Sequence, residues 1–356
     1  MPELLRAVSE ARIAWVAIYA LAVGLGMYWV GLGLTVRHLQ RRKSQCPSYP
    51  PLSILIPTHR PGEARRLLEQ LITLQYEAPW EVVLIMDRLP EESRNELYAY
   101  VARARIPIQT VEISETAEGW SPKKYALLRG VEVASYEWIV VLDADVEVER
   151  DYLSRLMEAV EEGVIAVVGL GWLRGRGRGA LGAWEAAIIQ LESVGRATWG
   201  CAYMSTGRGW AVQKSWLKQG LYLWREIISG DDDLTLQMIP ARCVRGSAAA
   251  TISDAPATLQ TYLQRKQRHL QTGRYYRRGT LLSLGFIAGG YSALWAIALL
   301  TGGFWGAPLL VWLARTFAVF LCRAPVGWSG PLWDGALVIL QSAVYPLLGL
   351  VRVKRW

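Results

Sequence analysis

The sequence predicts an α/β fold, in which a doubly wound, mainly parallel, Rossmann-like sheet lies between hydrophobic helices at the two ends of the chain. Short apolar runs alternate with helical patterns in the middle of the chain, and long stretches without charge occupy both ends. In addition, 52% of the 356 residues are hydrophobic and 17 are tryptophan, a composition that is unusual for a purely soluble protein.

The predicted sheet is assembled from short, β-branched apolar runs. Such nearly continuous runs are typical of parallel strands that are buried on both faces, and the patterns between them have helical periodicity. The runs are Ser53–Pro57, Glu81–Met86 and Trp138–Leu142, and the helical patterns are Glu63–Leu74, Glu91–Arg103 and Lys123–Ala134. This alternation predicts a doubly wound domain over residues 44–256.

A hydrophobic helix precedes this domain in residues 1–43. The run from Ile13 to Val36 has no charge, and as a helix it would span about 36 Å, enough to cross a bilayer. A signal peptide is the alternative, but the run is long for one and no clean cleavage site precedes its basic flank. Basic residues just after a span favour the cytoplasmic side. We therefore expect a retained anchor that leads into a cytoplasmic domain through Arg37, His38, Arg41, Arg42 and Lys43.

The C-terminal region, residues 280–356, predicts two or three further membrane segments. Thr280–Ala314 carries no charge and is interrupted by glycines and a proline, which predicts one span, a turn and the start of another. A last apolar run extends from Gly335 to Val351. Three full spans would put the basic tail outside, against the positive-inside tendency, so a re-entrant segment is the alternative to a third span. Arg315 favours it, because a charge at membrane depth faces protein or a watery cavity. The tail residues are Arg352, Lys354 and Arg355.

Residues 257–279 form a basic segment just ahead of these spans. No acidic residue occurs between Asp254 and Asp334, whereas six basic residues are crowded together: Arg265, Lys266, Arg268, Arg274, Arg277 and Arg278. Such a cluster is typical of a cytoplasmic helix at the membrane surface.

Carboxylates follow two of the predicted strands. Asp87 follows the second strand, and Asp143 and Asp145 follow the last. In doubly wound sheets, ligands bind beyond the carboxyl ends of the strands. Two acids one residue apart at a strand end that turns can converge on a hard cation and its phosphates, although solvated acids in a turn are the plain alternative. The sequence has neither a dinucleotide fingerprint nor a P-loop motif, so a nucleotide would have to be held in another way.

Seven motifs, in order over residues 50–280, together resemble glycosyltransferase family 2 with the GT-A fold: SILIPTHR, EVVLIMD, SPKKYALLRG, WIVVLDADVEV, STGRGWAVQKS, SGDDDLTL and RKQRH. The membrane-flanked layout is similar to that of ceramide glucosyltransferases and processive polysaccharide synthases, and in particular to a bacterial branch of integral-membrane members. The resemblance implies an enzyme that uses a nucleotide sugar as donor and Mg²⁺ or Mn²⁺ as cofactor.

The resemblance also implies roles for the residues at the strand ends. Pro57 and Thr58 would line the nucleoside pocket, and Asp87 would accept a hydrogen bond from the base. Asp143 would contact the ribose or the metal, and Asp145 would bind the metal.

Two further motifs would face the diphosphate and the sugars. Lys123 matches the lysine that approaches the diphosphate, with a solvated lysine at a helix start as the alternative. Gly207 and Ala211 match the turn and helix start that face the donor and acceptor sugars, where the lack of a long side chain allows close approach.

Asp231 matches the general base of the family. A positioned carboxylate can take the proton of an acceptor hydroxyl that attacks the anomeric carbon. The three acids Asp231, Asp232 and Asp233 could instead cap the following helix. We expect both roles, with Asp231 as the catalytic residue and the other two as cap or support. Gly230 stands where many relatives carry a glutamate.

Arg265, Arg268 and His269 match the basic motif of the family, with His269 in place of its tryptophan. Their spacing puts them on one helix face, where they could hold a diphosphate and cover the acceptor. Binding of anionic lipid is the alternative for a basic helix before a membrane span.

These observations predict an inverting hexosyltransferase of the bacterial cytoplasmic membrane. It would move a sugar from a UDP-linked donor to a hydroxyl of a lipid or lipid-linked acceptor at the cytoplasmic face. A processive polysaccharide synthase and a degenerate, non-catalytic membrane binding protein are the alternatives; the short C-terminal region argues against the first and the intact aspartates against the second. Nucleic acid is not an expected partner, because the arginines of RGRGRG are not interleaved with aromatic residues.

Overall fold

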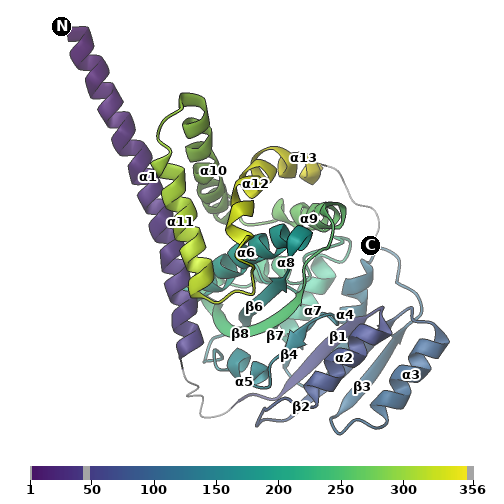
Figure 1. Ribbon diagram of the computed structural model, residues 1–356. Coiled ribbons are helices and arrows are strands. Elements are labelled where there is room, and N and C mark those ends of the chain that lie inside the picture. The colour runs from purple at the N-terminus through teal and green to yellow at the C-terminus, as the bar shows by residue number, and fades with distance from the viewer. Residues whose placement is uncertain (1, 43–48, 351–356) are drawn as a thin grey trace.

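The computed structural model describes residues 2–42 and 49–350; Lys43 and the tail residues Arg352, Lys354 and Arg355 lie outside this range. Within it, the centre is a mixed sheet in the order β3-β2-β1-β4-β7-β6-β8-β5 (Figure 1). The strands are β1 (Leu52–Thr58), β2 (Trp80–Asp87), β3 (Ile108–Ile113), β4 (Trp138–Val141), β5 (Glu147–Val148), β6 (Ala166–Arg174), β7 (Trp210–Gln213) and β8 (Val244–Asp254).

The half of the sheet formed by β3, β2, β1 and β4 is parallel, as the apolar runs predict. Its side chains alternate between the two faces, so Ile54 and Ile56 belong to one buried cluster and Leu55 to the other. Because helices cover both faces, these strands can be apolar at nearly every position.

Three of the five described helices over this half agree closely with the helical patterns of the sequence. On one face lie α2 (Pro61–Leu71), α3 (Glu91–Val101) and α5 (Tyr152–Met157), and on the other lie α4 (Pro122–Val133) and α7 (Lys214–Leu223). The three that agree are α2, α3 and α4, whereas α5 and α7 were not predicted. Helix α4 begins with a proline in its first turn, where the missing N–H costs nothing. The start of α4, with Lys123 in its first turn, lies at the carboxyl ends of the strands.

The other half of the sheet mixes directions. β7 runs antiparallel to β4 and β6, while β6 and β8 are parallel and β5 pairs antiparallel with β8. Three helices belong to this half: α6 (Ala180–Thr198), which is buried along almost its whole length, α8 (Asp233–Met238) and α9 (Leu259–Gly273). The remaining short turns of 3₁₀ helix are η1 (Gly177–Gly179), η2 (Ala241–Cys243) and η3 (Gly330–Trp333).

The hydrophobic ends of the chain come together beside the domain. They form α1 (Pro2–Arg41), α10 (Arg278–Thr301), α11 (Gly306–Leu321), α12 (Asp334–Ile339), the π-helical turn η4 (Leu340–Val344) and α13 (Tyr345–Leu350). The first part of α1 extends away from the domain, and α11 lies alongside α1 (Figure 1). In the described part of the chain, three segments are long and apolar enough to cross a membrane: Arg12–Arg41, Arg278–Thr301 and Gly330–Leu348.

Arg315 faces protein, as the sequence predicts for a charge in this region. Its guanidinium lies 3.3 Å from Asp334 Oδ1 and stacks over the rings of Trp29 and Tyr291. Asp334 is fully buried and also accepts hydrogen bonds from Trp184 Nε1 (2.8 Å) and Tyr291 Oη (2.6 Å). One buried ion pair thus joins α1, α10, α11 and α12 to helix α6 of the domain.

Candidate active site

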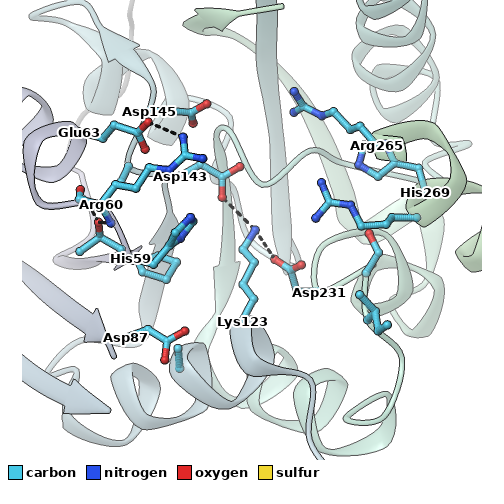
Figure 2. Close-up of a pocket in the computed structure, with 17 residues that line it drawn as sticks. His59, Arg60, Glu63, Asp87, Lys123, Asp143, Asp145, Asp231, Arg265 and His269 are labelled. Atoms are coloured by element: carbon cyan, nitrogen blue, oxygen red, sulfur yellow. Dashed lines mark hydrogen bonds and ion pairs between the residues drawn. The ribbon is translucent and has the colours of Figure 1, made fainter. Parts of the chain in front are cut away.

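A cavity of about 500 Å³ opens at the carboxyl ends of β1, β2 and β4, and it brings together nearly all the residues that the sequence singles out. Parallel strands end at the same edge of a sheet, which is why residues so far apart in the chain meet there. Its lining includes Pro57, Thr58, Asp87, Lys123, Asp143, Asp145, Asp231, Arg265, Arg268 and His269 (Figure 2).

Lys123 lies between two of the carboxylates. Its Nζ is 2.9 Å from Asp143 Oδ1 and 3.2 Å from Asp231 Oδ2 (Figure 2). Burial alone would lower the pKa of Lys123, but these two carboxylates raise it above its ordinary value. Gly207 makes room for the arrangement, because a Cβ there would lie 2.8 Å from Lys123 Nζ. The lysine is therefore a fixed positive charge at the centre of the cavity.

Asp143 and Asp145 could hold part of a divalent metal site. Both line the cavity, and partial burial together with Asp143 raises the pKa of Asp145. Two neighbouring carboxylates with such mutual repulsion suit a hard cation that prefers oxygen ligands. Among the described residues, no group of three or more His, Cys, Asp or Glu side chains is placed to hold a metal.

Asp87 is at the cavity wall, but its carboxylate is already engaged. Arg88 Nε and a second guanidinium nitrogen donate to the two oxygens of Asp87, each at 2.9 Å. Arg88 itself has a left-handed backbone, with φ of 51°. A nucleobase that forms a hydrogen bond with Asp87 would have to share the Asp87 carboxylate with Arg88 or displace the Arg88 side chain from it.

The three consecutive acids divide their roles. Asp231 is buried, with 6% of its surface exposed, and faces the cavity. Asp232 caps helix α8, since its side chain accepts from the Asp233 N–H at 2.8 Å. Asp233 accepts from Tyr276 Oη at 2.7 Å, and burial raises the pKa of Asp233 to about 6. Asp232 thus caps the helix, while Asp231 faces the cavity beside Lys123.

Gly230, the residue before these acids, has a φ of 82°. That conformation strains any residue with a Cβ. A Cβ would also lie 2.7 Å from Thr272 Cγ2 and 2.8 Å from Leu234 Cγ. A glutamate at this position would not fit this turn.

Helix α9 brings the basic motif to the same cavity. A capping box between Thr258 and Thr261 begins the helix, and Arg265, Arg268 and His269 face the cavity. Enclosure by protein atoms, reinforced by nearby cations including Arg265, lowers the pKa of His269 well below its ordinary value. The imidazole is thus neutral at neutral pH.

A second cavity, of about 140 Å³, adjoins the first. The two share six lining residues: Lys123, Asp143, Ser229, Asp231, Arg265 and His269. Gly207 lines the second cavity, whereas Ala211 does not line either one, because it is fully buried within β7 between Val140 and Val167. Apolar side chains form much of the remaining wall: Leu173, Ala186, Ile189, Met204 and Pro256.

Several further residues line the two cavities. His59 and Arg60 follow Thr58 directly, at a strand end where the sequence predicts ligand-binding residues, whereas Glu63 lies in α2 and was not predicted. Ile228 and Ser229 line the first cavity, and Arg208 lines the second. Burial lowers the pKa of Arg208 to about 10. Arg208 reaches the site from the loop before β7, and Ile228 and Ser229 reach it from the loop before α8. The strand pattern of the sequence does not predict the position of these loops.

Comparison with known proteins identifies a family and a fold. The family model described as glycosyl transferase family 21 matches residues 13–347. The mannosyltransferase PcManGT from Pyrobaculum calidifontis, in complex with GDP-Man and Mn²⁺, is similar with a TM-score of 0.50 and 16% identity, over 93% of this chain and 94% of that chain. Glucosyl-3-phosphoglycerate synthase from Mycobacterium tuberculosis, in complex with Mn²⁺, UDP-glucose and glycerol 3-phosphate, has a TM-score of 0.39 and 12% identity, over 62% of this chain and 78% of that chain. No curated protein sequence matches. The first likeness confirms the expected GT-A fold.

Proposed function

The chain belongs to glycosyltransferase family 21, and from that premise we propose that it transfers a sugar from a UDP-linked donor to a hydroxyl group of a membrane lipid at the cytoplasmic face. The motifs resemble family 2, whereas the matching model is that of family 21, which the similarity to ceramide glucosyltransferases fits. Sugar transfer follows from family membership; the nucleotide, the lipid acceptor and the membrane face are our proposal.

The observation that carries the proposal is the position of Asp231 in the wall that two adjoining cavities share. The larger cavity contains cations and the paired acids that suit a nucleotide diphosphate and its metal. The smaller one shares Lys123 and Arg265 with it and also has apolar side chains from α6 and its surroundings. A ligand with a hydroxyl at one end and a hydrocarbon part at the other matches the smaller cavity.

The chemistry would be a single displacement. The acceptor oxygen attacks the anomeric carbon, the bond from that carbon to the diphosphate oxygen breaks, and the proton of the acceptor hydroxyl passes to Asp231. Attack opposite the leaving group inverts the configuration of the anomeric carbon. Lys123, Arg265 and Arg268 lie around the larger cavity, where their charges would stabilise the departing diphosphate.

A divalent cation would complete the donor site. Asp143 and Asp145 supply the oxygen ligands that Mg²⁺ and Mn²⁺ prefer. When bound, the cation would offset negative charge on the leaving diphosphate. The chain's own contribution is to keep Lys123 next to Asp143, which neutralises that carboxylate.

We also propose how the chain meets the membrane. Helices α1 and α10 would cross it, but Gly330–Leu348 is tied to helix α6 at two places. Asp334 accepts from Trp184, and Tyr345 donates to the neighbouring Glu185 at 2.8 Å. A segment held to adjacent residues of one helix at both ends cannot reach the far side of a bilayer. This supports a re-entrant or surface segment beside the smaller cavity, which Glu185 lines.

The proposal is tested with detergent-solubilised protein, a panel of labelled UDP- and GDP-linked sugars, and total membrane lipid. We expect one nucleotide sugar to yield a lipid that carries a single added sugar, identified by mass spectrometry. A ladder of polymer lengths would indicate a processive synthase instead. Release of free sugar with no lipid product would contradict the lipid acceptor.

A further inference from the structure

Two adjacent lysines at the start of α4 have opposite surroundings. Lys123 faces the cavity and pairs with Asp143 and Asp231. Lys124 points into the protein, with only 1% of its surface exposed. Its Nζ donates three hydrogen bonds to main-chain carbonyls, at 2.8 Å to Trp224, 2.8 Å to Ile227 and 2.9 Å to Ser229.

These carbonyls belong to segment 224–229, which links α7 to the three acids and has no regular helix or strand. A chain without regular structure tends to leave carbonyls without backbone partners. Lys124 donates to three carbonyls here, of which that of Trp224 also accepts from the Ile227 N–H at 3.0 Å. Ser121, at the cap of α4, adds a hydrogen bond from its N–H to the Arg225 carbonyl at 2.7 Å. The first turn of α4 therefore holds the whole segment.

The segment ends directly at the site. Ser229 lines both cavities and is followed by Gly230, whose left-handed turn leads to Asp231. Only Gly230 separates the last carbonyl held by Lys124 from the carboxylate that lies against Lys123. A shift of Ser229 would therefore move Asp231 away from the acceptor hydroxyl.

The three bonds fit the chemistry of an ammonium group. It has three N–H donors and no acceptor, so the three carbonyls satisfy it completely. Burial lowers the pKa of Lys124 to about 8, and Lys123 acts in the same direction, whereas Asp231, Asp232 and Asp233 oppose the change. A neutral amine would retain two donors for three carbonyls.

We propose that Lys124 is a positioning residue that fixes segment 224–229 through three carbonyls and thereby holds Asp231 in place for proton transfer from the acceptor. This role rests on the proposed function of Asp231. The bonds themselves are independent of it, so the test has one readout with activity and one without.

The variant Lys124→Met keeps the apolar length of the side chain and removes the three donors. The matched control is Lys214→Met, which removes a single lysine bond to the Ala134 carbonyl (2.6 Å) at the other end of α7. In Lys124→Met, we expect amide hydrogen exchange over 224–230 to rise at least about tenfold, with no such rise in the control. We also expect kcat to fall about 10- to 100-fold, because small misplacements of reacting groups cost rates of that order. The KM for the donor should change by less than about threefold.

The pH profile separates positioning from general stability. In the wild-type chain, kcat should fall as the pH rises through about 8. Lys214→Met should keep this alkaline limb, and Lys124→Met should lose it. If Lys124→Met does not fold, Ser121→Ala provides the second variant, because it removes the weaker bond from Ser121 Oγ to the Ile228 carbonyl (3.3 Å) and should raise exchange over the same segment.

Unchanged exchange over 224–230 in both the Lys124 and the Ser121 variants would overturn the proposal. So would a Lys124→Met enzyme with the kcat and alkaline limb of the control. If the wild-type chain transfers no sugar to lipid, the proposed function fails, and the exchange measurement still decides whether Lys124 fixes the segment.

Discussion

The ammonium group of Lys123 lies 3.2 Å from Oδ2 of Asp231. The same ammonium also holds Asp143, so one cation joins the end of β4 to the acid that precedes α8. Removing it would leave two carboxylates facing each other and would remove a charge from the diphosphate site. The consequence should appear in both donor binding and turnover.

We therefore expect Lys123→Met to weaken binding of the nucleotide sugar about tenfold or more, since hydrogen bonds to charged groups are each worth about 1.5–3 kcal/mol. Titration of intrinsic tryptophan fluorescence with the nucleotide measures this. Lys214→Met, whose lysine lies outside both cavities, should bind as the wild type does. Equal affinity in the two variants would show that Lys123 does not contact the donor.

Gly230→Ala tests the backbone turn before Asp231. A Cβ at this φ costs about 1–2 kcal/mol, and here it would also press on Thr272 and Leu234. Gly163→Ala is the matched control, because Gly163 has a φ of 80° and nothing within 4 Å of the added atom. Both variants should lose unfolding free energy in chemical denaturation, and Gly230→Ala alone should also lose kcat, by about tenfold or more. Equal activity of the two variants would contradict the role of this turn.

Three of the four strands of the parallel half could be predicted because each is a nearly continuous apolar run, whereas β3 (IQTVEI) mixes polar and apolar residues and was not predicted. The runs at Ser53, Glu81 and Trp138 became β1, β2 and β4. The same reasoning did not find β8, whose sequence VRGSAAATISD consists mostly of small residues and gives no apolar run. Its strand form depends on pairing with β6 and β5, which no local pattern records.

The residues of the site could likewise be predicted only in part. The acids at strand ends were predictable, since the topology of a doubly wound sheet gathers them. Ala211 could not be judged from its motif, because the strand β7 begins at Trp210 and carries it into the core. The orientation of Lys124 could not be predicted either, because the motif SPKKYALLRG does not indicate which of its two lysines faces the cavity. The orientation of α4 decides it.

Asp145→Asn tests the metal site without relying on turnover. Replacing a carboxylate ligand by an amide should weaken Mn²⁺ binding at least about tenfold, because hard cations prefer charged oxygen ligands. Paramagnetic resonance of free Mn²⁺ measures the binding directly in the presence of nucleoside diphosphate. Asp151→Asn, which alters an exposed partner of Arg155, is the control. The same Mn²⁺ affinity in both variants would exclude Asp145 as a ligand.

Arg315→Met tests the buried link between the hydrophobic helices and the domain. It leaves Asp334 charged and buried beside Trp184 and Tyr291, and removal of one partner of such a pair costs about 3–5 kcal/mol. Unfolding in detergent should report this loss. Arg65→Met removes exposed pairs with Glu69 and Glu96, which solvent screens, and should cost far less. Similar losses in the two variants would mean that the buried pair does not hold the helices.

The central claim, that Asp231 removes the proton from a lipid hydroxyl, is tested most directly by Asp231→Asn. The measurement is the rate at which labelled sugar enters lipid, taken together with nucleotide and Mn²⁺ binding on the same preparation. We predict that the affinities for nucleotide and Mn²⁺ stay within about threefold of the wild type, while the rate of sugar transfer to lipid falls by at least about 100-fold, the scale of general base catalysis. Transfer at the wild-type rate by a variant that binds donor normally would contradict it.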